Sequence, residues 1–339
     1  MQELPASGSA KLRLGVLGCA GIATGRVLPA ARYAKRVDVV AIASRDIDRA
    51  RSTASRFNIP RAHGSYEALL RDEGVDAIYN PLPNSLHAAW TVAAAEAGKH
   101  VLCEKPLSVT LSEGRTMVTA CEQHHVQLME AFMYRHHPQH AVAREFLQRP
   151  DMGKLVHVRS SFSFVLGKPQ GNIRLMPDLA GGALMDVGCY TINLARWMVG
   201  SEPQAVQAWQ RDAVGAGVDT SVAMLLEFAD GQAATLDASF DKYGGGRYEL
   251  VCEYGMVSVG AAFTPGAAPV TVTCEQGERV ETRRVTAIDQ YALELDHFAA
   301  IVLDGIPRSP AENGLANMAV VDAVHRAMAT GARVDVEVV

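Results

Sequence analysis

The first third of the chain alternates short apolar segments with helical ones, beginning at a glycine turn. Residues 12–17 are apolar, and they are followed by Gly18, Cys19, Ala20, Gly21 and Ile22, after which a helix is expected to about residue 33. A strand, a glycine turn and a helix in this order are typical of a dinucleotide-binding unit, in which the free N–H groups of the first helical turn meet a pyrophosphate. Ala20 replaces the usual second glycine, and its methyl group narrows the space for phosphate. The turn alone is also compatible with a connection that binds no ligand.

The end of the next expected strand, residues 37–43, indicates which dinucleotide is bound. Ser44, Arg45 and Asp46 follow this strand. An acidic residue at this place binds the adenosine ribose of NAD, whereas an arginine accommodates the additional phosphate of NADP. Because Ser44 and Arg45 come first, the sequence predicts NADP, and Asp46 leaves NAD open. The alternative is a surface ion pair of Arg45 with Asp46 or Asp48.

Two further strand ends carry candidate site residues. The strand at 77–80 leads to Pro81, Leu82, Asn84 and His87, and the strand at 99–103 leads to Glu104, Lys105 and Pro106. Ligands bind outside the carboxyl ends of the strands in parallel sheets. Lys105 is therefore placed to point at a substrate, whereas a structural role is the alternative for His87.

The sequence pattern changes near residue 134. Long segments of alternating polar and apolar residues follow at 155–165, 204–211, 220–228, 232–240, 247–253, 270–274 and 281–285, and two helices are expected at 290–303 and 312–329. The chain also exceeds what one hydrophobic core usually holds. We therefore predict an α/β domain at 1–133 with a doubly wound parallel Rossmann sheet, and an α+β domain at 134–339 with an open, mostly antiparallel sheet.

A less regular segment at 168–200 contains a second group of candidate residues. A glycine pair at 181–182 precedes a helix in which Asp186 and Tyr190 are four residues apart. Residues at this spacing share one face of an α-helix. A carboxylate and a phenol arranged in this way can serve proton transfer. An amphipathic helix with a buried tyrosine is the alternative.

Composition argues against several classes of protein. The net charge of -5 has no basic cluster set against it, so neither nucleic acid nor an anionic membrane is an expected partner. The first ten residues do not look like a signal peptide, and no apolar run reaches the roughly 18 residues of a membrane span. The six cysteines are dispersed, which predicts thiols in a reducing compartment. The histidine pairs at 124–125 and 136–137 diverge in direction, so no metal site is expected. We expect a cytoplasmic protein that acts on a small molecule.

Four motifs together resemble the Gfo/Idh/MocA oxidoreductases, the glucose-fructose oxidoreductase and inositol dehydrogenase family. They are the glycine turn at 18–23, the sequence PLPN at 81–84 with His87, the sequence GKH at 98–100 leading to EKP at 104–106, and GGALMDVGCY at 181–190. The resemblance covers nearly the whole chain. It implies a Rossmann domain and a C-terminal domain with an open sheet that carries the substrate and often the oligomer interface, and hence a homodimer or homotetramer.

The resemblance also implies roles for individual residues. It places Lys105 and Asp186 in the active site and Glu104 and Arg135 near the cofactor, and it implies a cis peptide bond before Pro106. Many members have histidine where this chain has Tyr190. That difference resembles the branch of glucose-fructose and aldose oxidoreductases, NADP-linked xylose dehydrogenases, dimeric dihydrodiol dehydrogenases and nucleotide-sugar ketoreductases. Arg174 is a further candidate cofactor contact, and Tyr291 either approaches the nicotinamide or belongs to the core.

The sequence thus predicts an NADP-dependent oxidoreductase that moves a hydride between nicotinamide and a hydroxyl or carbonyl carbon of a sugar or polyol. Tyr190 is the favoured proton-transfer group, and a nearby Lys105 ammonium would lower its pKa from about 10. Alternatively, Lys105 transfers the proton while Tyr190 holds the oxygen, and Asp186 orients the substrate or Lys105. The rival enzyme is a nucleotide-sugar ketoreductase, with Lys168 and Arg174 facing a diphosphate. A cofactor-binding sensor without turnover is the alternative from another class.

Overall fold

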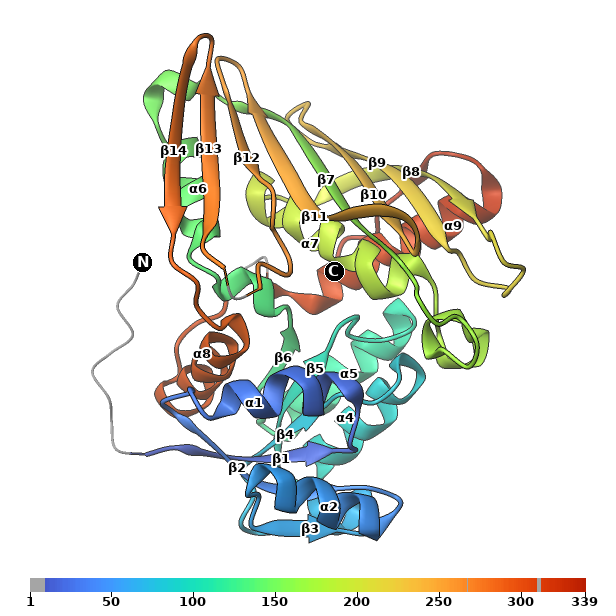
Figure 1. The fold of residues 1–339 in the computed structure, drawn as a ribbon. Coiled ribbons are helices and arrows are strands. Elements are labelled where there is room, and N and C mark those ends of the chain that lie inside the picture. Colours follow the sequence, from blue (N-terminus) through green and yellow to red (C-terminus); the bar gives the residue numbers. More distant parts are fainter. Residues whose placement is uncertain (1–9, 267, 310–311) are drawn as a thin grey trace. The chain divides into compact units, whose positions relative to one another are not determined.

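The computed structural model describes residues 10–266, 268–309 and 312–339, and it divides the chain into two compact units (Figure 1). The first unit runs to His136 and takes in residues 289–314, and the second comprises residues 137–288 and 315–339. The break at His136 lies close to the predicted boundary. The prediction that residues 134–339 form one domain needs a correction, because residues 289–314 belong to the first unit.

A six-stranded sheet forms the centre of the first unit, in the order β3-β2-β1-β4-β5-β6. Its strands are β1 (Leu12–Leu17), β2 (Val37–Ala43), β3 (Arg61–His63), β4 (Ala77–Asn80), β5 (His100–Glu104) and β6 (Leu128–Ala131). All neighbours pair in parallel. This strand order is that of the doubly wound dinucleotide-binding fold, and it confirms the Rossmann prediction. The order reverses between β1 and β4, where such sheets bind their ligands.

The first unit contains several α-helices and one π-helical turn. The α-helices are α1 (Leu28–Ala31), α2 (Ile47–Phe57), α3 (Tyr66–Leu70), α4 (His87–Glu96), α5 (Leu111–Gln123) and α8 (Gln290–Asp304). A π-helical turn at Ala23–Val27 precedes α1 and follows the glycine turn. Pro29, in the first turn of α1, has no N–H to donate to a carbonyl four residues earlier. The break in the regular α-helical bonding at this point is consistent with that missing donor.

Helix α8 joins the first unit because its apolar face lies in that unit's core. Leu295, Phe298 and Ile301 are buried in a cluster with residues of β1 and β2. The carboxylate of Asp296 also accepts the backbone N–H groups of Lys35 and Arg36 at 2.7 and 2.8 Å. An apolar helical face can pack on either of two sheets, so its sequence pattern did not reveal which one it covers.

The second unit contains a nine-stranded sheet in the order β14-β13-β12-β11-β7-β10-β9-β8-β15. The strands are β7 (Leu155–Val165), β8 (Pro203–Arg211), β9 (Ser221–Phe228), β10 (Ala233–Ser239), β11 (Asp241–Cys252), β12 (Met256–Val259), β13 (Val270–Gln276), β14 (Arg279–Val285) and β15 (Val334–Asp335). Strands β7 and β10 pair in parallel, and the other pairings are antiparallel. The mostly antiparallel sheet is thereby confirmed, although the short strands β12 and β15 were not predicted.

Helices cover one face of this sheet. They are α6 (Gln139–Leu147), α7 (Cys189–Val199) and α9 (Gly314–Thr330), of which α7 packs on β7 and β10 and α6 packs on β12 and β13. Residues such as Val222, Met224 and Leu226 of β9 are buried, and the residues between them are more exposed. This alternation indicates one buried and one more exposed face, and among the described residues no helix covers the second face, as is common in antiparallel sheets (Figure 1).

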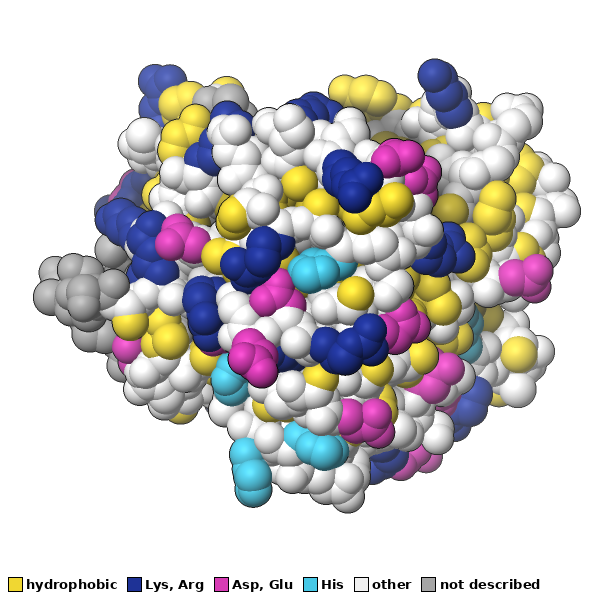
Figure 2. Space-filling view, turned by 90° about the horizontal axis from the view of Figure 1, so that it is seen from below, with side chains coloured by type: hydrophobic (Ala, Val, Ile, Leu, Met, Phe, Trp, Pro, Cys, Tyr) yellow, Lys and Arg dark blue, Asp and Glu magenta, His cyan; other side chains and the backbone are white. Residues whose placement is uncertain are grey.

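Among the described residues there is no candidate membrane-spanning helix, no disulfide and no candidate metal-binding cluster. No helix in the described ranges has the length and apolar character needed to cross a bilayer. The six cysteines all lie in the described part of the chain, are buried, and form no disulfide there. Those ranges also hold no cluster of three or more His, Cys, Asp or Glu side chains arranged for a metal ion. On the face shown in Figure 2, lysines and arginines are interspersed with acidic residues.

Candidate active site

The predicted pyrophosphate turn lies at the carboxyl end of β1. Gly18 has a φ of 79°, and its N–H donates to the carbonyl of Ala43 at 2.8 Å. A Cβ at this position would lie 3.1 Å from the side chain of Leu82 and 3.4 Å from the hydroxyl of Tyr66. Both the conformation and the available space therefore favour glycine. Cys19 is buried, Ala20 and Ile22 are partly exposed, and Gly21 is exposed.

At the end of β2, Asp46 is bound to the backbone of the next helix, whereas Arg45 is exposed. The carboxylate of Asp46 accepts the backbone N–H groups of Asp48 and Arg49 at 2.9 and 3.2 Å and forms the N-cap of α2. The hydroxyl of Ser44 accepts the N–H of Asp46 at 3.2 Å. Arg45 between them is exposed. The acid that left NAD open in the sequence is thus committed to capping a helix.

Two residues that the sequence analysis did not select lie beside this turn. The guanidinium of Arg49 donates to the carbonyl of Cys19 at 2.9 Å. Tyr66 lies between Gly18 and Arg45: burial raises the pKa of Tyr66, and the positive charge of Arg45 opposes that rise. The signal in the sequence for Arg49 is a second arginine four residues after Arg45, and no local pattern marks Tyr66. The structure therefore groups two arginines and a tyrosine around the end of β2.

His87 joins the two loops that carry the other predicted contacts of this unit. Its side chain is fully buried, with Nδ1 2.8 Å from the carbonyl oxygen of Pro106 and Nε2 2.8 Å from that of Leu82. Burial lowers the pKa of His87, and the two carbonyl groups oppose that change. His87 thus supports the loop after β4 and the loop after β5. Direct contacts of His87, and of Pro81, Leu82 and Asn84, with a cofactor stay predictions.

The segment of Glu104, Lys105 and Pro106 is held on both sides of the lysine. The hydroxyl of Tyr79 donates to the carboxylate of Glu104 at 2.7 Å, and the N–H of Leu107 donates to that of Glu130 at 2.8 Å. The Lys105–Pro106 peptide bond is cis, as the family resemblance implied. Lys105 is partly exposed between these two anchored positions. The lysine thus follows the carboxyl end of β5, as predicted.

Glu104 lies in an acidic and largely buried environment. Burial, and secondarily the charge of Glu104, raise the pKa of Glu294 well above its ordinary value, which favours the neutral acid. Burial likewise raises the pKa of Tyr291, and the charges of Glu104 and Glu294 add to the effect. Tyr291 packs against the core of the first unit. Its core role is observed, and its approach to nicotinamide stays a prediction.

Arg135 lies in a short 3-10 turn, Met133–His136, after β6. Its guanidinium donates to the hydroxyl of Ser309 at 3.0 Å. This contact connects the end of β6 with the segment that follows α8. The predicted place of Arg135 near a cofactor is not tested by this contact.

Asp186 and Tyr190 belong to the second unit, and the helix between them is not regular. Leu184–Gly188 forms a π-helical turn, in which the N–H of Cys189 donates to the carbonyl of Leu184. The four-residue spacing therefore does not have the α-helical geometry that the sequence analysis assumed. The ring of Tyr190 is buried, edge-on to Phe162 and Phe263 at 5.4 and 5.5 Å.

Arg174 contacts the candidate catalytic aspartate within the same unit. Its Nε donates to the carboxylate of Asp186 at 2.5 Å, and its backbone carbonyl accepts the N–H of Gly182 at 2.8 Å. The guanidinium is also 6.0 Å from the ring centre of Phe164. Arg174 thus orients Asp186, a role that the sequence analysis did not anticipate, and its contact with a cofactor stays a prediction.

Family comparisons match both units of the chain. Residues 12–132 match the model described as the oxidoreductase family with an NAD-binding Rossmann fold, and residues 140–258 match the GFO/IDH/MocA C-terminal domain. The first match contains the glycine turn and the Lys105 segment, and the second contains Asp186 and Tyr190.

Individual relatives span nearly the entire chain. D-xylose 1-dehydrogenase (NADP(+)) 2 of Haloferax volcanii is 42% identical over 96% of this chain and 100% of its own length. A 3-ketoreductase from Actinomadura kijaniata, solved with NADP and TDP-benzene, has a TM-score of 0.87 and 36% identity, covering 94% of this chain and 98% of that one. An aldose-aldose oxidoreductase from Caulobacter crescentus, solved with glycerol, has a TM-score of 0.88 and 28% identity, covering 96% and 100%.

Proposed function

This chain belongs to the GFO/IDH/MocA family of oxidoreductases, and we propose that it is an NADP-dependent dehydrogenase or oxidoreductase of sugars or polyols. The proposal rests mainly on one observation: the glycine turn, Arg45 and Lys105 all follow strands of one parallel sheet at their carboxyl ends. A xylose dehydrogenase and an aldose-aldose oxidoreductase among the relatives support the substrate class.

The residues around β1 and β2 fit NADP. At the turn, Gly18 has a positive φ, and a Cβ there would lie only 3.1 Å from the side chain of Leu82, so the tight turn of a pyrophosphate-binding loop favours glycine at this position. Arg45 is exposed while Asp46 is engaged as a helix cap, which suits an additional phosphate better than a bare ribose. Arg49 supplies a second positive charge beside the turn. When bound, NADP would accept or donate the hydride.

The chain's own residues handle the hydroxyl proton. We assign the transfer to Tyr190, or to Lys105 with Tyr190 holding the oxygen, because both are groups that can gain or lose a proton. Asp186, held by Arg174 at 2.5 Å, is a fixed carboxylate that can orient a hydroxyl group. The two schemes differ in which variant loses a limb of the pH–rate profile.

The first test measures turnover with a panel of aldoses, polyols and nucleotide sugars by the absorbance of the reduced cofactor. Lys105→Ala and Tyr190→Phe are each expected to lower turnover by roughly two to four orders of magnitude, a loss typical of removing acid-base assistance. Binding of NADP should stay nearly intact. Lys154→Ala and Tyr254→Phe, at surface positions, are the matched controls. Turnover near the wild-type rate in both site variants would contradict the assignment.

The same panel decides between the alternatives. Turnover of nucleotide sugars alone would favour the ketoreductase function that the Actinomadura kijaniata relative has. Tight NADP binding without turnover of any substrate would favour the sensor. Tightly bound cofactor that survives purification would favour an oxidoreductase that recycles it without exchange. The cytoplasmic location remains a prediction from the sequence.

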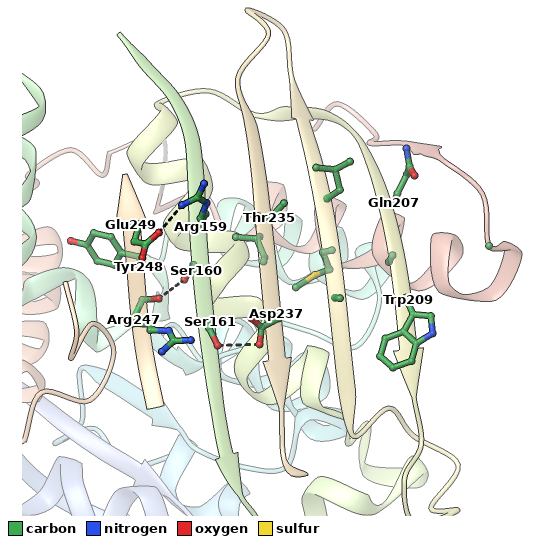
Figure 3. A pocket seen from close by; sticks show the side chains of 16 residues that line it. Arg159, Ser160, Ser161, Gln207, Trp209, Thr235, Asp237, Arg247, Tyr248 and Glu249 are labelled. Carbon is green, nitrogen blue, oxygen red and sulfur yellow. Dashed lines mark hydrogen bonds and ion pairs between the residues drawn. The ribbon is translucent and has the colours of Figure 1, made fainter. Parts of the chain in front are cut away.

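We also propose that the uncovered sheet face of the second unit binds a second copy of the chain. A hollow of about 740 Å³ lies on this face, and its lining includes Arg159, Ser161, Thr235, Asp237, Arg247 and Glu249 (Figure 3). Arg159 and Glu249 form an ion pair at 3.0 Å, and Trp209 is 58% exposed. A face that carries both signs of charge and an exposed aromatic ring suits an isologous dimer contact.

Light scattering coupled to size-exclusion chromatography tests this interface. We expect the wild type to elute as a dimer or a larger even-numbered assembly, and Trp209→Glu to shift it toward the monomer. Tyr254→Glu, at another exposed aromatic residue of the same unit, should leave the mass unchanged. A monomeric wild type, or equal effects of the two substitutions, would contradict the proposal.

A further inference from the structure

The helix that carries Asp186 and Tyr190 begins against a residue from a distant part of the second unit. The N–H of Ala183 donates to the backbone carbonyl of Asp219 at 2.8 Å, and the N–H of Leu184 donates to its carboxylate at 2.7 Å. The first N–H groups of a helix have no partner within the helix. Asp219 therefore supplies two of the acceptors that this helix start requires.

Gly182 allows this approach. It has a φ of 115°, and a Cβ at this position would lie 2.3 Å from the Oδ1 atom of Asp219. Any side chain at residue 182 would thus push the carboxylate away. On its other side, the N–H of Gly182 donates to the carbonyl of Arg174 at 2.8 Å. The helix start is consequently held between Asp219 and the segment that contains Arg174.

The carboxylate of Asp219 is buried although burial opposes its charge. Asp219 is only 5% exposed, and burial raises its pKa to about 6. The hydrogen bonds from backbone N–H groups lower this pKa and so oppose the effect of burial. The negative charge of Asp212 adds a small further increase. An aspartate in such a place is costly for the fold, so its presence calls for a role beyond filling space.

The contacts of Asp219 continue to the candidate catalytic aspartate. Leu184 is two residues before Asp186, whose backbone N–H donates to the carbonyl of Gly182 at 3.0 Å. The side chain of Asp186 is held in turn by Arg174 at 2.5 Å. A shift of Leu184 or Gly182 would therefore move both the backbone and the side-chain partner of Asp186.

We propose that Asp219 is a positioning residue for the reaction: it fixes the start of the helix and thereby places Asp186 and Tyr190. The proposal rests on the proposed oxidoreductase function. In this role Asp219 acts through the backbone, since its carboxylate accepts the N–H of Leu184, and the role requires no proton transfer by Asp219. Asp219 thus holds the catalytic groups in place before the substrate binds. This matters for the rate because a misplacement of a catalytic group by about 1 Å can slow a reaction about 100-fold.

The experiment compares Asp219→Ala, Asp219→Asn and Asp212→Asn in the full-length chain with NADP. Asp212 is the matched control, because its carboxylate orders the nearby loop through the N–H groups of Val214, Ala216 and Gly217. Two readouts are measured: hydrogen–deuterium exchange of the peptide spanning residues 183–190, and kcat, KM and the pH–rate profile with the substrate found in the panel. Thermal unfolding confirms that each variant is folded.

We expect Asp219→Ala to raise exchange at 183–190 by about 3- to 30-fold, which corresponds to losing a helix N-cap. Its kcat should fall about 10- to 100-fold while the Kd for NADP is unchanged. Asp219→Asn keeps one acceptor oxygen, so its kcat should stay within about fivefold of the wild type with an unshifted pH profile. Asp212→Asn should change neither readout.

Three results would overturn the proposal. Exchange at 183–190 that is unchanged in Asp219→Ala would show that the residue does not fix the helix. Faster exchange with unchanged kcat would show that the helix start does not matter for the reaction. A large loss in Asp219→Asn with a missing limb of the pH profile would show that Asp219 transfers a proton. If wild type turns over no substrate, the proposed function fails, and the exchange measurement alone then decides whether Asp219 fixes the helix.

Discussion

Replacing Arg45 with alanine should weaken NADP binding selectively. Arg45 is exposed at the end of β2, and the neighbouring carboxylate of Asp46 is bound to two backbone N–H groups at 2.9 and 3.2 Å. A hydrogen bond to a charged group contributes roughly 1.5–3 kcal/mol. With a factor of ten for each 1.4 kcal/mol, the Kd for NADP should rise about 10- to 150-fold. The Kd for NAD, which lacks the additional phosphate, should change by less than about threefold.

Calorimetric titration of NADP and NAD into wild type, Arg45→Ala and Asp46→Asn measures these changes. Asp46→Asn is the control, because asparagine caps helices about as well as aspartate but carries no charge. It should leave the ratio of the two Kd values unchanged. Since Arg45 is exposed, its effect should also shrink as salt rises from about 0.05 to 0.5 M.

Either of two results would refute this reasoning. If Arg45→Ala weakens NADP and NAD equally, then Arg45 does not read the additional phosphate. If wild type prefers NAD and Asp46→Asn removes that preference, then Asp46 reads the ribose despite its contacts in the helix cap. The second result would also return the cofactor assignment to NAD.

Three other substitutions test the support of the site. His87→Ala removes the contacts of a fully buried ring with two loop carbonyl groups and should lower the free energy of unfolding by about 2–4 kcal/mol in urea titrations; a loss below 1 kcal/mol would contradict the role of His87. The pKa of Asp219 in the folded protein is about 6, above its ordinary 3.8, so folding favours the protonated side chain. The contribution of this side chain to the free energy of unfolding is therefore largest at low pH and is lost as pH rises from about 4 to 6. Asp219→Asn should remove that pH-dependent component, of about 3 kcal/mol, and an unchanged pH dependence would refute it. Gly182→Ala should destabilise by about 1–3 kcal/mol, whereas Gly21→Ala, at an open position, should stay within about 0.5 kcal/mol; equal effects would contradict the close approach at residue 182.

Features encoded by neighbouring residues could be predicted from the sequence. The alternation of strands and helices from Leu12 to Ala131, the turn at Gly18 and the place of Lys105 after β5 all depend on local periodicity and turn chemistry. These patterns involve only a few neighbouring residues, so they can be recognised in the sequence without knowledge of the tertiary structure. For the same reason, the segments of alternating polar and apolar residues after residue 150 predicted the second sheet.

Features that depend on distant residues could not be predicted in this way. The sequence shows α8 as an apolar helix, but only the packing of Phe298 in the first core shows which unit it joins. It shows His87 in the first turn of a helix, but only the structure shows that its ring meets the carbonyl of Pro106, 19 residues further along the chain.

The sequence by itself therefore determined the two fold types, the family resemblance and the candidate residues Lys105, Asp186 and Tyr190. The tertiary structure decided what supports them in each unit: His87 behind the Lys105 loop, Arg174 on Asp186, and Asp219 at the start of the helix. The physical reason is that hydrogen bonds, burial and charge act between atoms that are close in space. Asp219 is 35 residues from Leu184 along the chain, and no local pattern records that they meet.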